Sequence, residues 1–297
     1  MTPTISITGL TRRYRHQTVL DDITLDIEGD CISGLLGRNG AGKTTLMRIL
    51  AAQEFPSAGQ VRVLGGNPVE SEAVLRRTIF IREDQAFPDI KVRDAVRVAS
   101  WFYPHWSGEL AETLLSDFDL PPNRNIKKLS RGMRAALGIV MGLAARAKVT
   151  LFDEPYAGLD AVARQLFYDR LLADYVEHPR TVLLSTHLID EVADLLEKVV
   201  VIDHGRIVLD AAADDVRGSA ATVSGSPAAV TEFVGGRPIL DSRTMASQES
   251  VVVVQSLNDF DRARARDLHL RVVPLSLQQL VVHAADRSLE NVKEMSA

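Results

Sequence analysis

One glycine-rich segment constrains this chain more than any other feature. Its residues are Gly37-Arg38-Asn39-Gly40-Ala41-Gly42-Lys43-Thr44, which satisfy the pattern G-x-x-x-x-G-K-[ST]. Cys31–Leu36, which precede it, read as a buried strand, and Thr44–Ala52 carry apolar side chains at helical spacing. The sequence therefore predicts a strand, a glycine turn and a helix in direct succession.

This segment has the chemistry of a phosphate cradle. Glycines let successive backbone N–H groups point at phosphate oxygens, and the helix that follows adds its positive N-terminal end. Lys43 supplies a mobile cation for the β and γ phosphates, and the hydroxyl of Thr44 can ligate Mg²⁺. We expect residues 37–45, Thr45 included, to bind a nucleotide.

A second apolar run, Val149–Phe152, ends in two carboxylates, Asp153 and Glu154. We expect Asp153 to hold Mg²⁺ through water and Glu154 to polarise the attacking water. Taken alone, the pair could also be acids that cap a strand where it enters solvent. The phosphate cradle upstream favours the catalytic interpretation, because Mg²⁺-nucleotide chemistry needs an acid at a strand end.

Short, nearly continuous apolar runs separated by helical segments are typical of parallel strands buried on both faces. Val149–Phe152, Thr181–Ser185 and Val199–Asp203 have this form, whereas Thr4–Thr8 and Ile23–Ile27 alternate. From about residue 92 to residue 145 the pattern is helical, with proline breaks. The chain is therefore expected to have an α/β fold.

Composition excludes several classes of protein. With 34 Lys and Arg against 39 Asp and Glu, the formal net charge is −5, so nucleic acid is not an expected partner. Cys31 is the only cysteine, which rules out an intramolecular disulfide and favours a reducing, cytosolic compartment. No apolar run approaches the roughly 18–20 residues that span a bilayer, and the first residues do not resemble a signal peptide.

Five further motifs follow a fixed order along the chain. They are Tyr14, Leu129-Ser130-Arg131-Gly132-Met133, Asp153-Glu154-Pro155, Gly158-Leu159-Asp160 and His187. In this order they resemble the adenine-stacking aromatic, the signature motif, the carboxylate motif, the D-loop and the switch histidine of the ABC ATPases. The resemblance covers about residues 4–215. It implies a P-loop NTPase core with an antiparallel β piece and a helical subdomain at about residues 90–146.

The resemblance also implies a mechanism in which two ATPase subunits close over ATP and Mg²⁺. Tyr14 would stack on adenine, while Ser130 and Gly132 of the other subunit would contact the γ-phosphate from the start of a helix. His187 would contact the γ-phosphate and order the attacking water. Asp160 would lie at the dimer interface.

The family's Q-loop residue has two candidates. Gln85 follows the strand-like Thr78–Ile81 and is the preferred ligand of Mg²⁺ and of the attacking water, but Glu83 fits the spacing of related families almost as well. In the signature motif, Arg131 replaces a glycine of LSGGQ and Met133 replaces its glutamine. This form is similar to the LSKGM of drug- and bacitracin-type exporters, which weakens an importer interpretation.

A shift to Gly, Ser and Ala around Arg217–Ser226 predicts a boundary, with an ATP-binding domain at residues 1–216 and an accessory or regulatory domain at residues 217–297. The second domain is expected to be a small α+β fold, in the order strand, helix, strand, strand, helix, strand, with a final helix at Leu277–Ala284. His269 and His283 lack Cys or acidic partners at ligand spacing, so no metal site is expected there. Dimerisation or regulation is the favoured role, and sensing of a small ligand is the alternative.

Aromatic side chains concentrate in Trp101-Phe102-Tyr103-Pro104-His105-Trp106. Aromatic rings bury large areas, so we favour the packing of a helix corner around Pro104. The alternative is a platform for a membrane partner.

These features predict the ATP-hydrolysing subunit of an ABC transporter. It would dimerise with itself or a related subunit on separate multi-span permease subunits, and it would power transport, with export favoured. Its expected location is the cytoplasm, attached to the cell membrane through the permease. The alternative is a soluble non-transport ABC ATPase, which the single phosphate loop and the lack of heptads between Lys43 and Asp153 disfavour.

Overall fold

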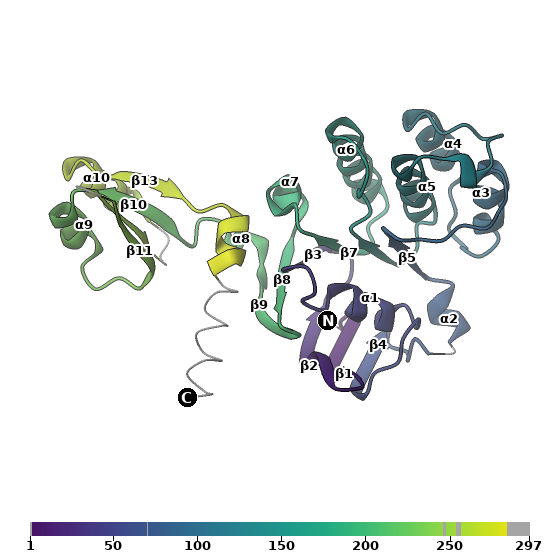
Figure 1. The fold of residues 1–297 in the computed structure, drawn as a ribbon, viewed down its shortest axis with the longest axis horizontal. Coiled ribbons are helices and arrows are strands. Elements are labelled where there is room, and N and C mark those ends of the chain that lie inside the picture. The colour runs from purple at the N-terminus through teal and green to yellow at the C-terminus, as the bar shows by residue number, and fades with distance from the viewer. Residues whose placement is uncertain (1, 70, 246–247, 254–256, 284–297) are drawn as a thin grey trace. The chain divides into compact units, whose positions relative to one another are not determined.

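The computed structural model describes residues 2–69, 71–245, 248–253 and 257–283 (Figure 1). The chain divides into two compact units, Met1–His187 with Asp194–Asp210, and Leu188–Ala193 with Ala211–Ala297. This division falls earlier in the chain than the boundary expected from composition. In the described part of the chain, no helix combines the length and the apolar character needed to cross a membrane.

A six-stranded sheet forms the centre of the first unit (Figure 1). Its strands, in spatial order, are β5 (Thr78–Arg82), β6 (Val149–Asp153), β7 (Thr181–Thr186), β3 (Ile32–Leu36), β8 (Lys198–Asp203) and β9 (Arg206–Ala212). β3, β6 and β7 are buried along their whole length, which fits their mostly apolar sequences. The first five strands are parallel, and Leu36 pairs with Thr186 while Asp153 pairs with Ser185. The chain segments that follow β3, β6 and β7 therefore leave the sheet at the same edge.

A second, antiparallel sheet consists of β2 (Gln17–Ile27), β1 (Ile5–Tyr14) and β4 (Ala58–Val63), in that order. Its apolar side chains share one core with α1 (Lys43–Leu50) and with residues of β6, β7 and β8. Because α1 and β3 are both anchored in buried structure, the glycine-rich segment between them is held at both ends.

The helical pattern expected between residues 92 and 145 forms three helices and one 3-10 turn, which lie together in Figure 1. The remaining helices of the unit are short, apart from α6. The bounds are α2 (Glu72–Leu75), α3 (Val92–Ser100), α4 (Gly108–Asp117), η1 (Ile126–Lys128), α5 (Arg131–Ala144), α6 (Ala161–Glu177) and η2 (Ala193–Leu195). A Cβ at Gly142 of α5 would lie 2.6 Å from the Phe152 ring, so glycine allows α5 to approach the sheet closely.

The aromatic segment after α3 is only partly packed. Trp101 and Phe102 are 64% and 60% exposed, so the packing expected for these two rings is wrong. Tyr103 and Trp106 are half-buried, and burial raises the pKa of Tyr103.

The second unit is built on an antiparallel four-stranded sheet in the order β11-β12-β10-β13. Its elements are α7 (Ile189–Val192), α8 (Ala213–Val216), β10 (Ala221–Gly225), α9 (Pro227–Val234), β11 (Ile239–Met245), β12 (Gln248–Val253), α10 (Asp259–Asp267) and β13 (Arg271–Pro274). From β10 to β13 the order of strands and helices is the predicted one. Residues 277–283 are helical, and Ala284 of the expected final helix lies outside the described residues.

Candidate functional site

The glycine-rich segment joins β3 to α1 at the carboxyl edge of the parallel sheet. Gly37, Gly40 and Gly42 have positive φ angles of 148°, 82° and 113°. A Cβ at Gly37 would lie 2.1 Å from the carbonyl oxygen of Ile202, so only glycine fits there. Because α1 begins at Lys43, the N–H groups of its first turn have no intrahelical acceptors and are free to bind an anion.

Lys43 folds back over the loop that precedes it. Its Nζ donates to the carbonyl oxygens of Gly37 at 2.7 Å and of Arg38 at 3.1 Å, and the residue is buried. Burial lowers the pKa of Lys43, against the opposing attraction of the Glu154 and Asp153 carboxylates. The ammonium is thus held against the carbonyl oxygens at the start of the glycine-rich segment.

The side-chain oxygens of Asp153 and Thr44 lie next to each other. The Thr44 hydroxyl donates to Oδ2 of Asp153 at 2.6 Å, across the gap between α1 and β6. Asp153 is 5% exposed, and its Oδ1 has no hydrogen-bond partner among the described residues. A buried carboxylate oxygen without a partner is costly, and a hard cation or its bound water would satisfy it.

Glu154 follows Asp153 in a left-handed backbone conformation, with a φ of 49°. This conformation is unfavourable for a residue with a Cβ, and it is typical of functional sites. Oε2 of Glu154 accepts a hydrogen bond from Nδ1 of His187 at 2.7 Å, which fixes the proton on that ring nitrogen. Oε1 is buried without a hydrogen-bond partner in the described part of the chain. The carboxylate is therefore held at one oxygen, while the other has acceptor capacity for a water molecule.

Tyr156 is a residue of this site that the sequence analysis missed. Its hydroxyl donates to Oε2 of Glu154 at 2.7 Å and also contacts the hydroxyl of Thr186 at the end of β7. The side chain is 2% exposed, and burial, followed by the charge of Glu154, raises its pKa far above the ordinary value. The phenol thus stays protonated as a donor to Glu154, and Thr186 must then donate to the phenol oxygen. The signal available in the sequence was a hydroxyl-bearing aromatic two positions after the carboxylate.

The phosphate-loop, carboxylate and histidine side chains line one cavity of about 380 Å³, and Tyr156 lies behind Glu154 outside this lining. It is lined by Val19, Asn39, Gly40, Gly42, Lys43, Thr44, Thr45, Glu83, Asp153, Glu154 and His187. The structure thus brings together most of the predicted phosphate, metal and catalytic residues. The predicted Gly37, Arg38 and Ala41 do not line it: Gly37 and Ala41 are buried, and Arg38 is exposed.

Of the two Q-loop candidates, Glu83 lines the cavity, whereas Gln85, the residue preferred from the sequence, does not. The backbone N–H of Glu83 donates to the carbonyl oxygen of Asp153 at 3.1 Å, and its carboxylate pairs with Arg131. Oε1 of Gln85 is buried and has no hydrogen-bond partner among the described residues. Position 83 lies directly after β5, whereas position 85 has turned away from the strand end.

Tyr14 lies at the end of β1 and does not line this cavity. Its hydroxyl donates to Glu54, and the guanidinium carbon of Arg12 lies 4.4 Å from its ring centroid. The ring is 38% exposed. One face is therefore engaged by a cation, and an adenine would have to use the other.

The signature residues also lie outside the cavity of their own chain. Ser130 is exposed and caps α5, where its hydroxyl oxygen accepts from the N–H of Met133 at 3.1 Å. A Cβ at Gly132 would lie 2.5 Å from the carbonyl oxygen of Gly158, so glycine lets the signature motif contact the D-loop. Asp160 caps α6 by accepting from the N–H of Ala163 at 2.9 Å.

Comparison with known proteins reveals clear relatives. The family model described as ABC transporter matches residues 20–157. Nod factor export ATP-binding protein I of Ralstonia nicotianae is 33% identical over 213 residues, which cover 69% of this chain and 66% of that protein. Daunorubicin resistance ATP-binding protein DrrA3 of Streptomyces coeruleorubidus is 30% identical over 72% of this chain and 69% of its own. Nod factor export ATP-binding protein I of Neorhizobium galegae is 29% identical over 97% of this chain and 87% of its own.

Solved structures share the fold. The ATP binding subunit of an ABC transporter matches with a TM-score of 0.65 at 24% identity, over 72% of this chain and 91% of that one. A bacterial Atm1-family ABC exporter with ATP bound matches with a TM-score of 0.63 at 20% identity, over 73% of this chain and 40% of that one. The predicted P-loop NTPase fold is confirmed. The family model and the relatives show that the chain belongs to the ATP-binding subunits of ABC transporters, the ATPases that power transport through membrane permease subunits.

Proposed function

We propose that this chain hydrolyses Mg²⁺-ATP in the cavity beside the glycine loop, with Glu154 as the general base. The observation that carries the proposal is the convergence of Lys43, the Thr44–Asp153 pair and the Glu154–His187 pair on one cavity. Phosphate release from ATP by the purified chain tests it. We expect turnover that requires Mg²⁺ and stops with excess EDTA, and turnover that persists unchanged in EDTA would contradict the metal assignment.

The residues present fit a magnesium ion. Thr44 Oγ1 and the two Asp153 oxygens are hard ligands, and the unpartnered Oδ1 lacks only a cation or its water. When bound, Mg²⁺ neutralises phosphate charge as it develops during transfer. Glu83 is our preferred third ligand or water contact, because it lines the cavity and Gln85 does not.

The protein side chains have separate roles in this proposal. Lys43 and the N–H groups of α1 bind the β and γ phosphates. Glu154 takes a proton from the attacking water, and Oε1 is its oxygen with acceptor capacity to spare. His187 holds the carboxylate through a proton on Nδ1, and a contact of Nε2 with a γ-phosphate oxygen would need a second proton on the ring.

A second ATPase subunit would complete the site. Ser130 and Gly132 do not line the cavity of their own chain, and in this proposal they close over ATP held by the second subunit. The contact between Gly132 and Gly158 would join the signature motif to the D-loop, with Asp160 at the interface. Tyr14 is our proposed adenine contact, through the ring face opposite Arg12.

We further propose that the chain powers export and attaches to the cytoplasmic side of the cell membrane through a permease. Support comes from the names of its relatives, which describe Nod factor export and drug resistance, and from the exporter-like signature motif. No observation favours a soluble, non-transport ATPase. Co-purification of a multi-span protein with this chain from membranes would support a permease, and recovery of the chain with no membrane protein would contradict it.

Replacing Tyr156 with phenylalanine tests the support of the general base. The substitution removes one hydrogen bond to Glu154 and keeps the buried ring, so we expect kcat to fall about tenfold with little change in KM for ATP. Tyr168→Phe is the matched control, because Tyr168 is also buried and packs its ring 6.3 Å from that of Tyr156. A purely structural role would lower the melting temperature and leave kcat unchanged.

A further inference from the structure

A second polar cavity, of about 420 Å³, lies in the first unit away from the nucleotide site. Three connections form it: the segment between α3 and α4, the segment between α5 and β6, and the segment between α6 and β7. The last two connections lead into the amino ends of β6 and β7, at the edge of the sheet opposite Asp153 and Thr186. Its lining consists of Pro104, His105, Trp106, Arg146, Lys148, His178, Pro179 and Arg180.

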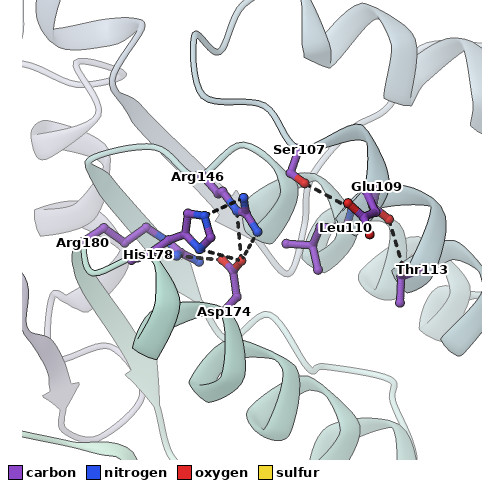
Figure 2. Close-up of polar contacts among 8 residues, drawn as sticks. All are labelled: Ser107, Glu109, Leu110, Thr113, Arg146, Asp174, His178 and Arg180. Carbon is purple, nitrogen blue, oxygen red and sulfur yellow. Dashed lines mark hydrogen bonds and ion pairs between the residues drawn. The ribbon is translucent and has the colours of Figure 1, made fainter.

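One buried carboxylate organises the cationic side of this cavity. Nε and Nη2 of Arg146 donate to Oδ1 of Asp174 at 2.9 and 2.7 Å, and Nη1 of Arg180 pairs with Oδ2 at 2.8 Å (Figure 2). Arg146 also reaches Nε2 of His178 at 2.9 Å. Two guanidinium groups therefore share a single carboxylate, and positive charge is left in excess.

Arg180 has hydrogen-bonding capacity that the protein does not use. The residue is 2% exposed, yet its Nε and Nη2 have no partner among the described residues. These two nitrogens form one edge of the guanidinium, the edge that can donate two parallel hydrogen bonds to an oxyanion. Burial lowers the pKa of Arg180, and the positive charge of Arg146 acts in the same direction. An anion at this edge would relieve both penalties.

The other residues that line the cavity also favour an anionic ligand. Lys148 is exposed and contributes a third cation, while no carboxylate is among the lining residues. Trp106 and the two prolines provide an apolar wall. The volume lies within the range typical of small-molecule sites, and it is too small for a folded partner.

We propose that this cavity binds the phosphate group of a small anionic molecule, with the free edge of Arg180 and the ammonium of Lys148 as its main contacts. Phosphate is favoured because a guanidinium edge binds two of its oxygens while an ammonium neutralises a third. The Arg180 edge is shielded from solvent, so binding involves a side-chain rearrangement at the cavity wall. The ligand could be a soluble phosphate compound or a lipid headgroup, and the two sources can be distinguished.

Calorimetric titration of the full chain with inorganic pyrophosphate tests the soluble source. We expect the glycine loop to bind this probe as well, so two binding steps should appear, and Lys43→Ala should weaken only one of them. Lys148→Gln should weaken the other step about tenfold, and Arg180→Gln should abolish it. Lys91→Gln is the control, since Lys91 is an exposed lysine outside both cavities. If Arg180→Gln fails to fold, Lys148→Gln alone tests the site, because the side chain of Lys148 is exposed and its replacement should not disturb the core.

Flotation with vesicles tests the lipid source. Vesicles of equal parts phosphatidylglycerol and phosphatidylcholine are compared with vesicles of phosphatidylcholine alone. Suppose that the chain binds the anionic vesicles, that Lys148→Gln weakens this binding, and that no second pyrophosphate step is seen. This result would support the site and assign the phosphate to a lipid headgroup. If Lys148→Gln changes binding in neither assay, the proposal is overturned.

Discussion

Replacing Glu154 with glutamine should reduce steady-state ATP hydrolysis by about 10²–10⁴-fold, the contribution typical of a general base. The amide keeps the shape of the side chain and still offers an oxygen to Tyr156 and His187, but it cannot take a proton from water. Lys43, Thr44 and Asp153 are untouched, so ATP should still bind. Bound but uncleaved ATP should then stabilise a dimer, which gel filtration with Mg²⁺-ATP would detect.

Glu112→Gln is the control for this experiment. Glu112 is exposed on α4 and does not line the nucleotide cavity, so its loss should leave turnover at the level of the unchanged protein. Turnover by Glu154→Gln at that same level would show that another group acts as the base.

Replacing Lys43 with alanine should weaken ATP binding about a hundredfold. Lys43 is buried and its ammonium is hydrogen-bonded to the glycine loop, so its contacts with phosphate would be charge-assisted and poorly screened. Calorimetry with ATP gives the affinity, and circular dichroism checks that the fold is kept. Lys91→Ala removes an exposed lysine and should leave the affinity unchanged. Equal ATP affinity for Lys43→Ala and the unchanged protein would contradict the phosphate cradle.

The parts of the site that sequence could predict are those in which chemistry fixes the spacing of neighbouring residues. The glycine loop needs positive φ angles at fixed positions, and Asp153 and Glu154 must follow a buried strand directly. The structure brings both segments to one cavity because parallel strands end at the same edge. The parallel sheet itself was predictable from continuous apolar runs.

Other parts depend on contacts between distant segments. Glu83 and Gln85 lie two positions apart in a loop, and only the direction of the chain after β5 places Glu83 in the cavity. The Tyr156 hydroxyl contacts both Glu154 and Thr186, and Thr186 lies at the end of another strand. Asp174 joins connections that are far apart in sequence. No local sequence pattern predicts such long-range contacts.

The antiparallel sheet shows a similar limit. β1 extends to Tyr14, well beyond the alternating run at residues 4–8. The alternation ends early because register shifts after Ile7 interrupt the regular pairing of β1 with β2. An irregular strand loses the two-residue period that identifies it in a sequence. Gly9, with a φ of 61°, marks the first of these irregularities.

A single-turnover experiment decides whether Glu154 acts in the chemical step or in ATP binding. Excess protein is mixed with Mg²⁺ and ATP labelled at the γ-phosphate, the reaction is quenched at successive times, and ATP and phosphate are separated. We expect the unchanged protein to cleave its bound ATP and Glu154→Gln to hold the same amount of ATP uncleaved. Cleavage by Glu154→Gln at the rate of the unchanged protein would show that Glu154 does not act in the chemical step.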